Sequence, residues 1–175
     1  TWSKNFLTTG INYVLEPIIT YDYYEPRIFG RYYTYPINYR GGCFISSDYR
    51  KPLALDVRVN YRVFNENKRS TINIFTSVRI RLNNKLSFVY DASYEDRIDD
   101  IGFVNYDYAT DTITLGRRNL QTISNTISGV YKFTNKMSLS VRGRHYWSRA
   151  NYGGYYNLEK NGNITPYAYQ NNHDV

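Results

Sequence analysis

The sequence contains few side chains that could carry metal or redox chemistry. It has one cysteine, Cys43, and two histidines, His145 and His173, among 175 residues. A single cysteine excludes an internal disulfide, and three such scattered side chains do not make a convincing metal site. Cys43 suits a short strand better than the role of a nucleophile. We therefore predict no metal, no cofactor and no catalytic residue.

Long hydrophobic runs are also missing. No apolar stretch approaches the roughly 18 residues of a membrane-spanning helix, and the mean hydropathy is −0.60. Low hydropathy does not exclude a membrane β-barrel, because half of each strand faces water. The chain begins at Thr1, without Met or a signal peptide, so we expect that processing or truncation removed its start. No linker divides it, which predicts a single region over residues 1–175.

Aromatic and basic residues are abundant instead. The chain has 21 Tyr and a formal net charge of +7. Tyrosine suits a membrane–water interface, since it joins an apolar ring to a polar tip. A net positive charge suggests nucleic acid as a possible class of partner. We predict no nucleic-acid partner, because the arginines alternate along strands and no zinc-ligand spacing or RNA-binding motif is present.

Three runs, Leu53–Phe64, 70–82 and 86–96, alternate strictly between apolar and polar side chains. A period of two predicts β-strands. Each run reaches the roughly 9–11 residues that a tilted strand needs to cross a bilayer, and one apolar and one charged face are typical of a membrane barrel. The residues that we predict to face lipid are Val57, Val59, Ile74, Val78, Ile80, Phe88 and Tyr90. The charged residues that we predict to line the lumen are Asp56, Arg58, Arg62, Arg79, Arg81, Asp91, Glu95, Arg142 and Arg144.

Two tight turns fix the expected register. Leu82 should lie beside Leu86 across Asn83-Asn84-Lys85, and Phe133 beside Met137 across Thr134-Asn135-Lys136, since three residues are a favoured hairpin length. The expected cross-strand pairs are Asp56 with Arg79, Ser77 with Asp91, Asn73 with Glu95, Ser128 with Arg142 and Thr126 with Arg144. These pairs either make a charged lumen that selects solutes or binds a plug, or simply stabilise the sheet as a ladder.

Further strands are predicted over residues 11–24, 37–48, 122–133 and 137–149, with a bulge or bend at Gly41-Gly42. The fold class is therefore all-β, an antiparallel up-and-down transmembrane β-barrel with about seven strands. Seven strands cannot close a single-chain barrel, so we expect part of a larger one. Residues 23–36, 97–119 and 150–172 should be long loops at one rim, with a small hairpin at Ala109-Thr110-Asp111.

Other readings of the sequence remain open. A soluble β-sandwich with Tyr-rich sheets would also alternate. His145 lies on the apolar face by parity, either as an interfacial side chain in an aromatic belt or as the base of an outer-membrane hydrolase. Asp96, Asp99 and Asp100 either form a solvated acidic loop or bind Ca²⁺, although the spacing of a calcium-binding loop is missing.

Three motifs resemble a known family. They are Ser46-Ser47-Asp48-Tyr49-Arg50-Lys51-Pro52, Gly116-Arg117-Arg118-Asn119 and Arg142-Gly143-Arg144-His145-Tyr146-Trp147-Ser148. They look like the C-terminal part of large Gram-negative outer-membrane proteins of uncharacterised function, in which a carbohydrate-binding-like module precedes a membrane β-barrel. The resemblance covers most of the chain from about Tyr23 onward. It implies further barrel strands on both sides of this region and carries over no catalytic residue.

The expected function is that of a non-enzymatic barrel in the bacterial outer membrane. It would act as an anchor, a solute pathway or a docking scaffold, with outer-membrane lipid, other envelope proteins, surface lipoproteins or a glycan as partners. The alternatives are an outer-membrane surface hydrolase and a soluble carbohydrate-binding β-sandwich. An enzyme would need a nucleophile and a base at one rim, and the sequence offers no such arrangement.

Overall fold

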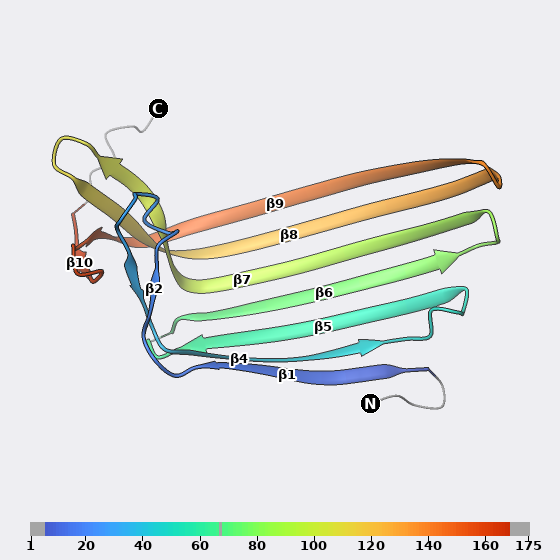
Figure 1. Ribbon diagram of the computed structural model, residues 1–175, viewed down its shortest axis with the longest axis horizontal. Coiled ribbons are helices and arrows are strands. Elements are labelled where there is room, and N and C mark those ends of the chain that lie inside the picture. Colours follow the sequence, from blue (N-terminus) through green and yellow to red (C-terminus); the bar gives the residue numbers. More distant parts are fainter. Residues whose placement is uncertain (1–5, 67, 169–175) are drawn as a thin grey trace.

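The computed structural model describes residues 6–66 and 68–168, and every regular element in these residues is a β-strand (Figure 1). Eight strands form one antiparallel sheet and two form a small second sheet. The strands of the large sheet are β1 (Thr8–Glu16), β4 (Asn38–Ser46), β5 (Leu53–Phe64), β6 (Ser70–Arg81), β7 (Leu86–Asp107), β8 (Thr112–Thr134), β9 (Met137–Leu158) and β10 (Ile164–Pro166). The small sheet pairs β2 (Thr20–Asp22) with β3 (Tyr33–Tyr35).

The large sheet follows the chain almost in order, β1-β4-β5-β6-β7-β8-β9-β10, as repeated hairpins require. Its seven long strands agree with the number expected from the alternating pattern. The sheet is open, because β1 and β10 stand at opposite edges of that order within the described residues. None of the described residues forms a helix long and apolar enough to cross a bilayer.

The predicted register holds on β6, β7, β8 and β9. Ser77 lies opposite Asp91, and Arg142 lies opposite Ser128. Asn73 with Glu95 and Thr126 with Arg144 are likewise confirmed. At the first tight turn, the Leu82 amide donates to the Leu86 carbonyl at 3.0 Å. The amides of Lys85 and Leu86 both donate to Asn83 Oδ1, so the asparagine side chain itself closes the turn.

The predicted pairing of Asp56 with Arg79 is wrong. The register between β5 and β6 places Asp56 opposite Ser77 and Arg79 opposite Ala54, two residues from the expected position. The connection between these strands includes Arg69, whose carbonyl accepts the amide of Phe64. An error of two residues keeps every side chain on its predicted face, because the strand period is two.

The second tight turn has two residues, one fewer than predicted. Thr134 pairs with Met137, leaving Asn135-Lys136 as a two-residue turn. A register shift between Lys132 and Thr134 places Phe133 in a bulge, so that it does not pair with Met137. The bulge restores the predicted register along the rest of the hairpin. The expected bulge at Gly41-Gly42, in contrast, is absent, since β4 pairs regularly with both neighbours there.

Much of the predicted loop structure near one rim is sheet. The expected small hairpin at residues 109–111 exists, but it is the tip of β7 and β8, which continue into it through register shifts. The region from residue 150, predicted as loop, continues β9 to Leu158 and then supplies β10. The predicted loop at 23–36 contains β3. Tyr-rich and Asn-rich residues from 150 onward thus pair along β8 and β9, while β3 pairs with the equally short β2.

The described parts of the three predicted rim segments, residues 23–36, 97–119 and 150–168, do lie together at the end of the sheet opposite the tight turns (Figure 1), while residues 169–172 lie outside the described residues. A small core joins them, with Tyr33, Ile101, Ile113, Leu115 and Leu158 buried. Arg31 donates to Asp111 at 3.3 Å and to the Leu158 carbonyl at 2.8 Å. The β2–β3 segment therefore leaves the β1–β4 side of the sheet and packs on β7, β8 and β9, forming a cap at this rim.

Candidate functional site

The large sheet has two chemically distinct faces, which we call the apolar face and the polar face. All seven residues predicted to face lipid lie on the apolar face, as pairs such as Val59 with Ile74 and Ile80 with Phe88 require. The nine charged residues predicted to line a lumen all lie on the polar face. That these faces meet lipid and a lumen stays a prediction.

The apolar face is uncovered. Ile11 is 85% exposed, and Leu53, Ile127 and Val141 are each more than half exposed. The small sheet packs at the rim and leaves these side chains open (Figure 1). In the described residues no second sheet covers this face as it would in a β-sandwich.

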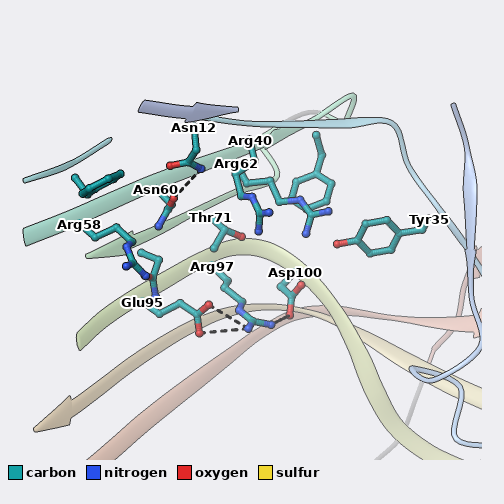
Figure 2. Close-up of a pocket in the computed structure, with 13 residues that line it drawn as sticks. Asn12, Tyr35, Arg40, Arg58, Asn60, Arg62, Thr71, Glu95, Arg97 and Asp100 are labelled. Carbon is teal, nitrogen blue, oxygen red and sulfur yellow. Dashed lines mark hydrogen bonds and ion pairs between the residues drawn. The ribbon is translucent and has the colours of Figure 1, made fainter. Parts of the chain in front are cut away.

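The polar face carries a hollow of about 630 Å³ beside the cap (Figure 2). Side chains from β1, β4, β5, β6 and β7 line it, and Tyr35 of the cap faces it from the rim. Its charged lining residues are Arg40, Arg58, Arg62, Arg97, Glu95 and Asp100. Four arginines against two carboxylates leave the hollow with an excess of positive charge.

Three of these arginines share one cross-strand row. Arg40 lies opposite Arg62, Arg62 opposite Thr71, and Thr71 opposite Arg97. Arg62 donates to Glu16 Oε2 at 3.2 Å. Its Nε also donates to the buried amide oxygen of Asn38 at 2.7 Å. Arg62 is therefore neutralised from the rim side, away from Arg40.

Arg97 is neutralised within its own strand. Its Nη2 donates to both oxygens of Glu95, at 3.1 and 3.2 Å, and Asp100 lies 3.8 Å from its other terminal nitrogen. Arg40 and Arg58 differ, because both residues are exposed and neither guanidinium group forms a hydrogen bond or an ion pair with any residue that the structure describes. These two guanidinium groups are the uncompensated charges of the hollow.

Amide side chains lie between the two unpaired arginines. Asn12 Nδ2 donates to Asn60 Oδ1 at 3.5 Å, from strands that are both neighbours of β4 (Figure 2). The two amides meet over Gly42, which pairs with both residues. A Cβ at Gly42 would lie 2.2 Å from Asn60 Oδ1 and 2.9 Å from Asn12 Oδ1. Glycine at this position therefore makes the space in which the amides approach each other.

A buried arginine from the connection between β5 and β6 contacts the cap at the rim side of the hollow. Arg69 is 3% exposed and donates to the Tyr33 hydroxyl oxygen at 3.0 Å and to Glu66 at 3.1 Å. Its guanidinium also lies 4.4 Å from the centre of the Phe64 ring. Burial raises the pKa of the Tyr33 phenol, and the charge of Arg69 opposes this shift. The cap is thus held by charge and hydrogen bonds as well as by its small apolar core.

The remaining predicted lumen residues lie away from this hollow. Asp56 accepts from Ser46 Oγ at 2.6 Å and from the Tyr49 hydroxyl, and Asp91 accepts from Ser77 Oγ at 2.6 Å. Asp91, Arg142 and Arg144 border a smaller hollow of about 290 Å³. Arg79 stacks over the Tyr49 ring at 4.9 Å, and Arg81 pairs across the strands with Ser87.

The other candidate residues do not assemble a reactive site. His145 lies on the apolar face beside Asn125, with Nδ1 3.5 Å from the amide nitrogen, while His173 lies outside the described residues. The backbone amide of Asp99 donates to Asn119 Oδ1, and the Asp100 carboxylate lies near arginines. No group of three His, Cys, Asp or Glu side chains in the described residues could hold a metal ion. Cys43 is exposed on the apolar face, between Ile11 and Val59.

Sequence reasoning missed several residues of the hollow. It placed Arg97 and Asp100 in a loop, and it left Arg40 out because the glycine pair beside it interrupts the alternation. The parity of Arg40 with Asn38 and Phe44 on one strand was the available signal. The role of Gly42 was not visible at all, since it depends on side chains from two other strands.

Comparison with known proteins gives one match. The model of the DUF5916 family, described as a domain of unknown function, matches residues 1–175. A search of curated proteins gave no match. A search of solved structures also gave no match.

Proposed function

The chain belongs to the DUF5916 family, and we propose that its large sheet is part of the wall of a β-barrel in a bacterial outer membrane. In this proposal the apolar face meets lipid and the polar face lines a water-filled lumen. The protein is not an enzyme but an anchor, solute pathway or docking scaffold. The observation that carries the proposal is an uncovered aliphatic face behind a charged one.

Exposure of aliphatic side chains supports lipid contact. An exposed apolar patch much larger than a few hundred Å² is unusual on a soluble monomer and marks a protein or membrane contact. Here the patch crosses all seven long strands, from Ile11 on β1 to Val141 on β9. Phe133 and Met137 extend it to the tight-turn end.

The apolar band crosses the strands obliquely, as tilted barrel strands require. On β9 the apolar residues lie between 139 and 147, which align through β8 with residues 86–94 of β7. On β1 residues 11–15 align through β4, β5 and β6 with residues 94–98 of β7. The band thus shifts by about one residue per strand, a stagger that accompanies barrel tilts of roughly 35–45°.

The edges of the sheet also favour a larger wall. β10 pairs with only Leu158, Asn157 and Tyr156 of β9, so most of the outer edge of β9 has no strand beside it within the described residues. Backbone N–H and C=O groups cannot remain unpaired in lipid. The proposal therefore requires further strands beside β1 and β9, either from the same protein or from a partner chain.

The two rims would then have different roles. The tight turns at Asn83-Asn84-Lys85 and Asn135-Lys136 suit the short-turn rim of an outer-membrane barrel, and the capped end suits its long-loop rim. The cap carries exposed Tyr23 and Tyr24, and the tip between β7 and β8 at the same rim carries exposed Tyr108. Such side chains contact sugars or protein partners well, so we propose this rim as the docking surface for a glycan or a surface lipoprotein.

Membrane fractionation tests the proposal. The protein should sediment with the outer membrane, resist extraction by alkaline carbonate, and require detergent for release. Its gel mobility should change on heating, because a folded barrel resists detergent denaturation at room temperature. Recovery in the soluble fraction, with mobility insensitive to heating, would contradict it.

A further inference from the structure

We propose that the hollow on the polar face binds an anionic solute, with Arg40 and Arg58 holding a phosphate or carboxylate group. The amides of Asn12 and Asn60 would bind the adjoining neutral part, such as sugar hydroxyls. This inference deepens the proposed function, on which it rests for the polar face being open to water. It assigns a ligand class to a site that the overall architecture does not specify.

The charge arrangement favours an anion. Arg40 faces Arg62 directly across β4 and β5, and like charges in that position destabilise a sheet. Arg62 uses Glu16 and Asn38 on its rim side, so nothing in the described chain offsets Arg40. A bound oxyanion would turn this repulsion into attraction for the fork-shaped donors of arginine.

The two unpaired arginines lie on either side of the amide pair. Arg40 pairs with Arg62, and Arg58 pairs with Phe44, while Asn60 lies between Arg58 and Arg62 on the same face of β5. Asn12 and Asn60 both lie opposite Gly42, where the absence of a side chain leaves room for the two amides. Guanidinium donors on both sides of the amide pair suit an anionic group that lies over the amides, with the polar neutral part of the ligand within reach of the same amides.

The carboxylates of the hollow are already engaged. Glu95 accepts two hydrogen bonds from Arg97, and Asp100 lies within 3.8 Å of Arg97 and of Arg69. Glu16 is held by Arg62. The acidic groups therefore lie toward the rim and toward β7, and the side of the hollow around Arg40 and Arg58 is the one that favours an anion.

Titration calorimetry on the purified protein in a nonionic detergent tests the inference. The probes are inorganic phosphate, glucuronate and neutral glucose, each at constant ionic strength. Binding of phosphate or glucuronate, with glucose much weaker, is the expected result, and the stronger anion identifies the group that the site prefers. Binding of neither anion, or equal binding of glucose, would overturn it.

Charge-removal variants locate the site. Arg40→Gln and Arg58→Gln should each weaken anion binding about tenfold or more, because each removes a charge-assisted hydrogen-bond donor. Arg81→Gln is the matched control: Arg81 is an arginine on the same face that lies at the tight-turn end and has no charged partner in the described residues. An equal loss in Arg81→Gln would mean non-specific attraction and would contradict the site.

Thermal unfolding supplies a second measurement. In the absence of an anion, Arg40→Gln should raise the melting temperature, because the repulsion by Arg62 disappears. Phosphate should raise the melting temperature of the unmodified protein, and this rise should be absent in Arg40→Gln. A lower melting temperature without anion would contradict the unpaired state of Arg40. Binding in detergent and fractionation with the outer membrane are measured separately. A protein that fractionates with the outer membrane but binds no anion would overturn this inference and leave the proposed function standing.

Discussion

Arg40 and Arg62 face each other directly across β4 and β5, and Glu16, which also accepts from Asn38 Nδ2 at 2.7 Å, forms an ion pair with Arg62 and not with Arg40. We predict that Glu16→Gln lowers the free energy of unfolding by about 1 kcal/mol, the size of a partly exposed ion pair. The loss should shrink in an Arg40→Gln background, because Arg62 then lacks a neighbouring cation. A double-mutant cycle measured by denaturant unfolding checks this coupling, and additive effects would contradict it.

Gly42 and Gly41 provide a matched pair on one strand. Gly42→Ala should destabilise the protein by about 1–3 kcal/mol, as overpacking does, because the new methyl group would meet Asn60 Oδ1 and the Val59 carbonyl oxygen. Gly41→Ala should have little effect, since nothing lies within 4 Å of its added Cβ. Equal effects of the two substitutions on denaturant unfolding would show that the amides do not meet over Gly42.

Val78 and Val130 test the two faces with the same residue type. Val78→Arg places a charge on the apolar face between Leu55 and Tyr90, and should cost about 2–4 kcal/mol in a lipid-folding assay. Val130→Arg lies on the polar face between Ser87 and Ser140 and should cost far less. If Val130→Arg proved the more damaging, the faces would be assigned the wrong way round.

The cap should lose stability at alkaline pH. Burial raises the pKa of Tyr33 above its ordinary value of 10.0. The unfolded state therefore loses this proton first, so the stability contribution is complete below pH 10 and declines as pH rises through the folded pKa. The free energy of unfolding should fall less steeply between about pH 9 and pH 11 in Tyr33→Phe than in the unmodified protein. Phenolate absorbance over the same pH range reports the ionisation. Identical pH profiles would exclude Tyr33 as the cause.

The sequence predicts the sheet far better than the cap. Strict alternation gave β5 its bounds and placed all nine charged residues predicted to line the lumen on the polar face, because a single period of two governs both. The Asn83 turn fixed the neighbouring register for the same reason. The same reasoning did not give the register between β5 and β6, because the carbonyl of Arg69 pairs with Phe64 and the polar residues between them do not by themselves fix the length of the turn.

The hollow was less predictable because its residues come from five strands and the cap. Arg58, Arg62 and Glu95 follow from alternation, whereas Arg97 required knowing that β7 continues past residue 96. That continuation depends on pairing with the tip of β8, which no local pattern in this polar region reveals. Arg40 is unpaired because Glu16 pairs with Arg62 instead. Glu16 on β1 comes near Arg62 on β5 only through the pairing of both strands with β4.

Cys43 allows the most direct test of the central claim, that the apolar face meets lipid. It is the one cysteine in the sequence and is exposed between Ile11 and Val59. A spin label there can be compared, in lipid bilayers, with a label at Phe44→Cys in a Cys43→Ser background, since Phe44 borders the polar hollow.

The measurement is the collision rate of each label with oxygen, which concentrates in lipid, and with a water-soluble nickel chelate. The account predicts that the label at Cys43 collides mainly with oxygen, while the label at position 44 shows the larger share of nickel collisions. A label at Cys43 that meets the nickel chelate as readily as the label at position 44 would contradict lipid contact by this face.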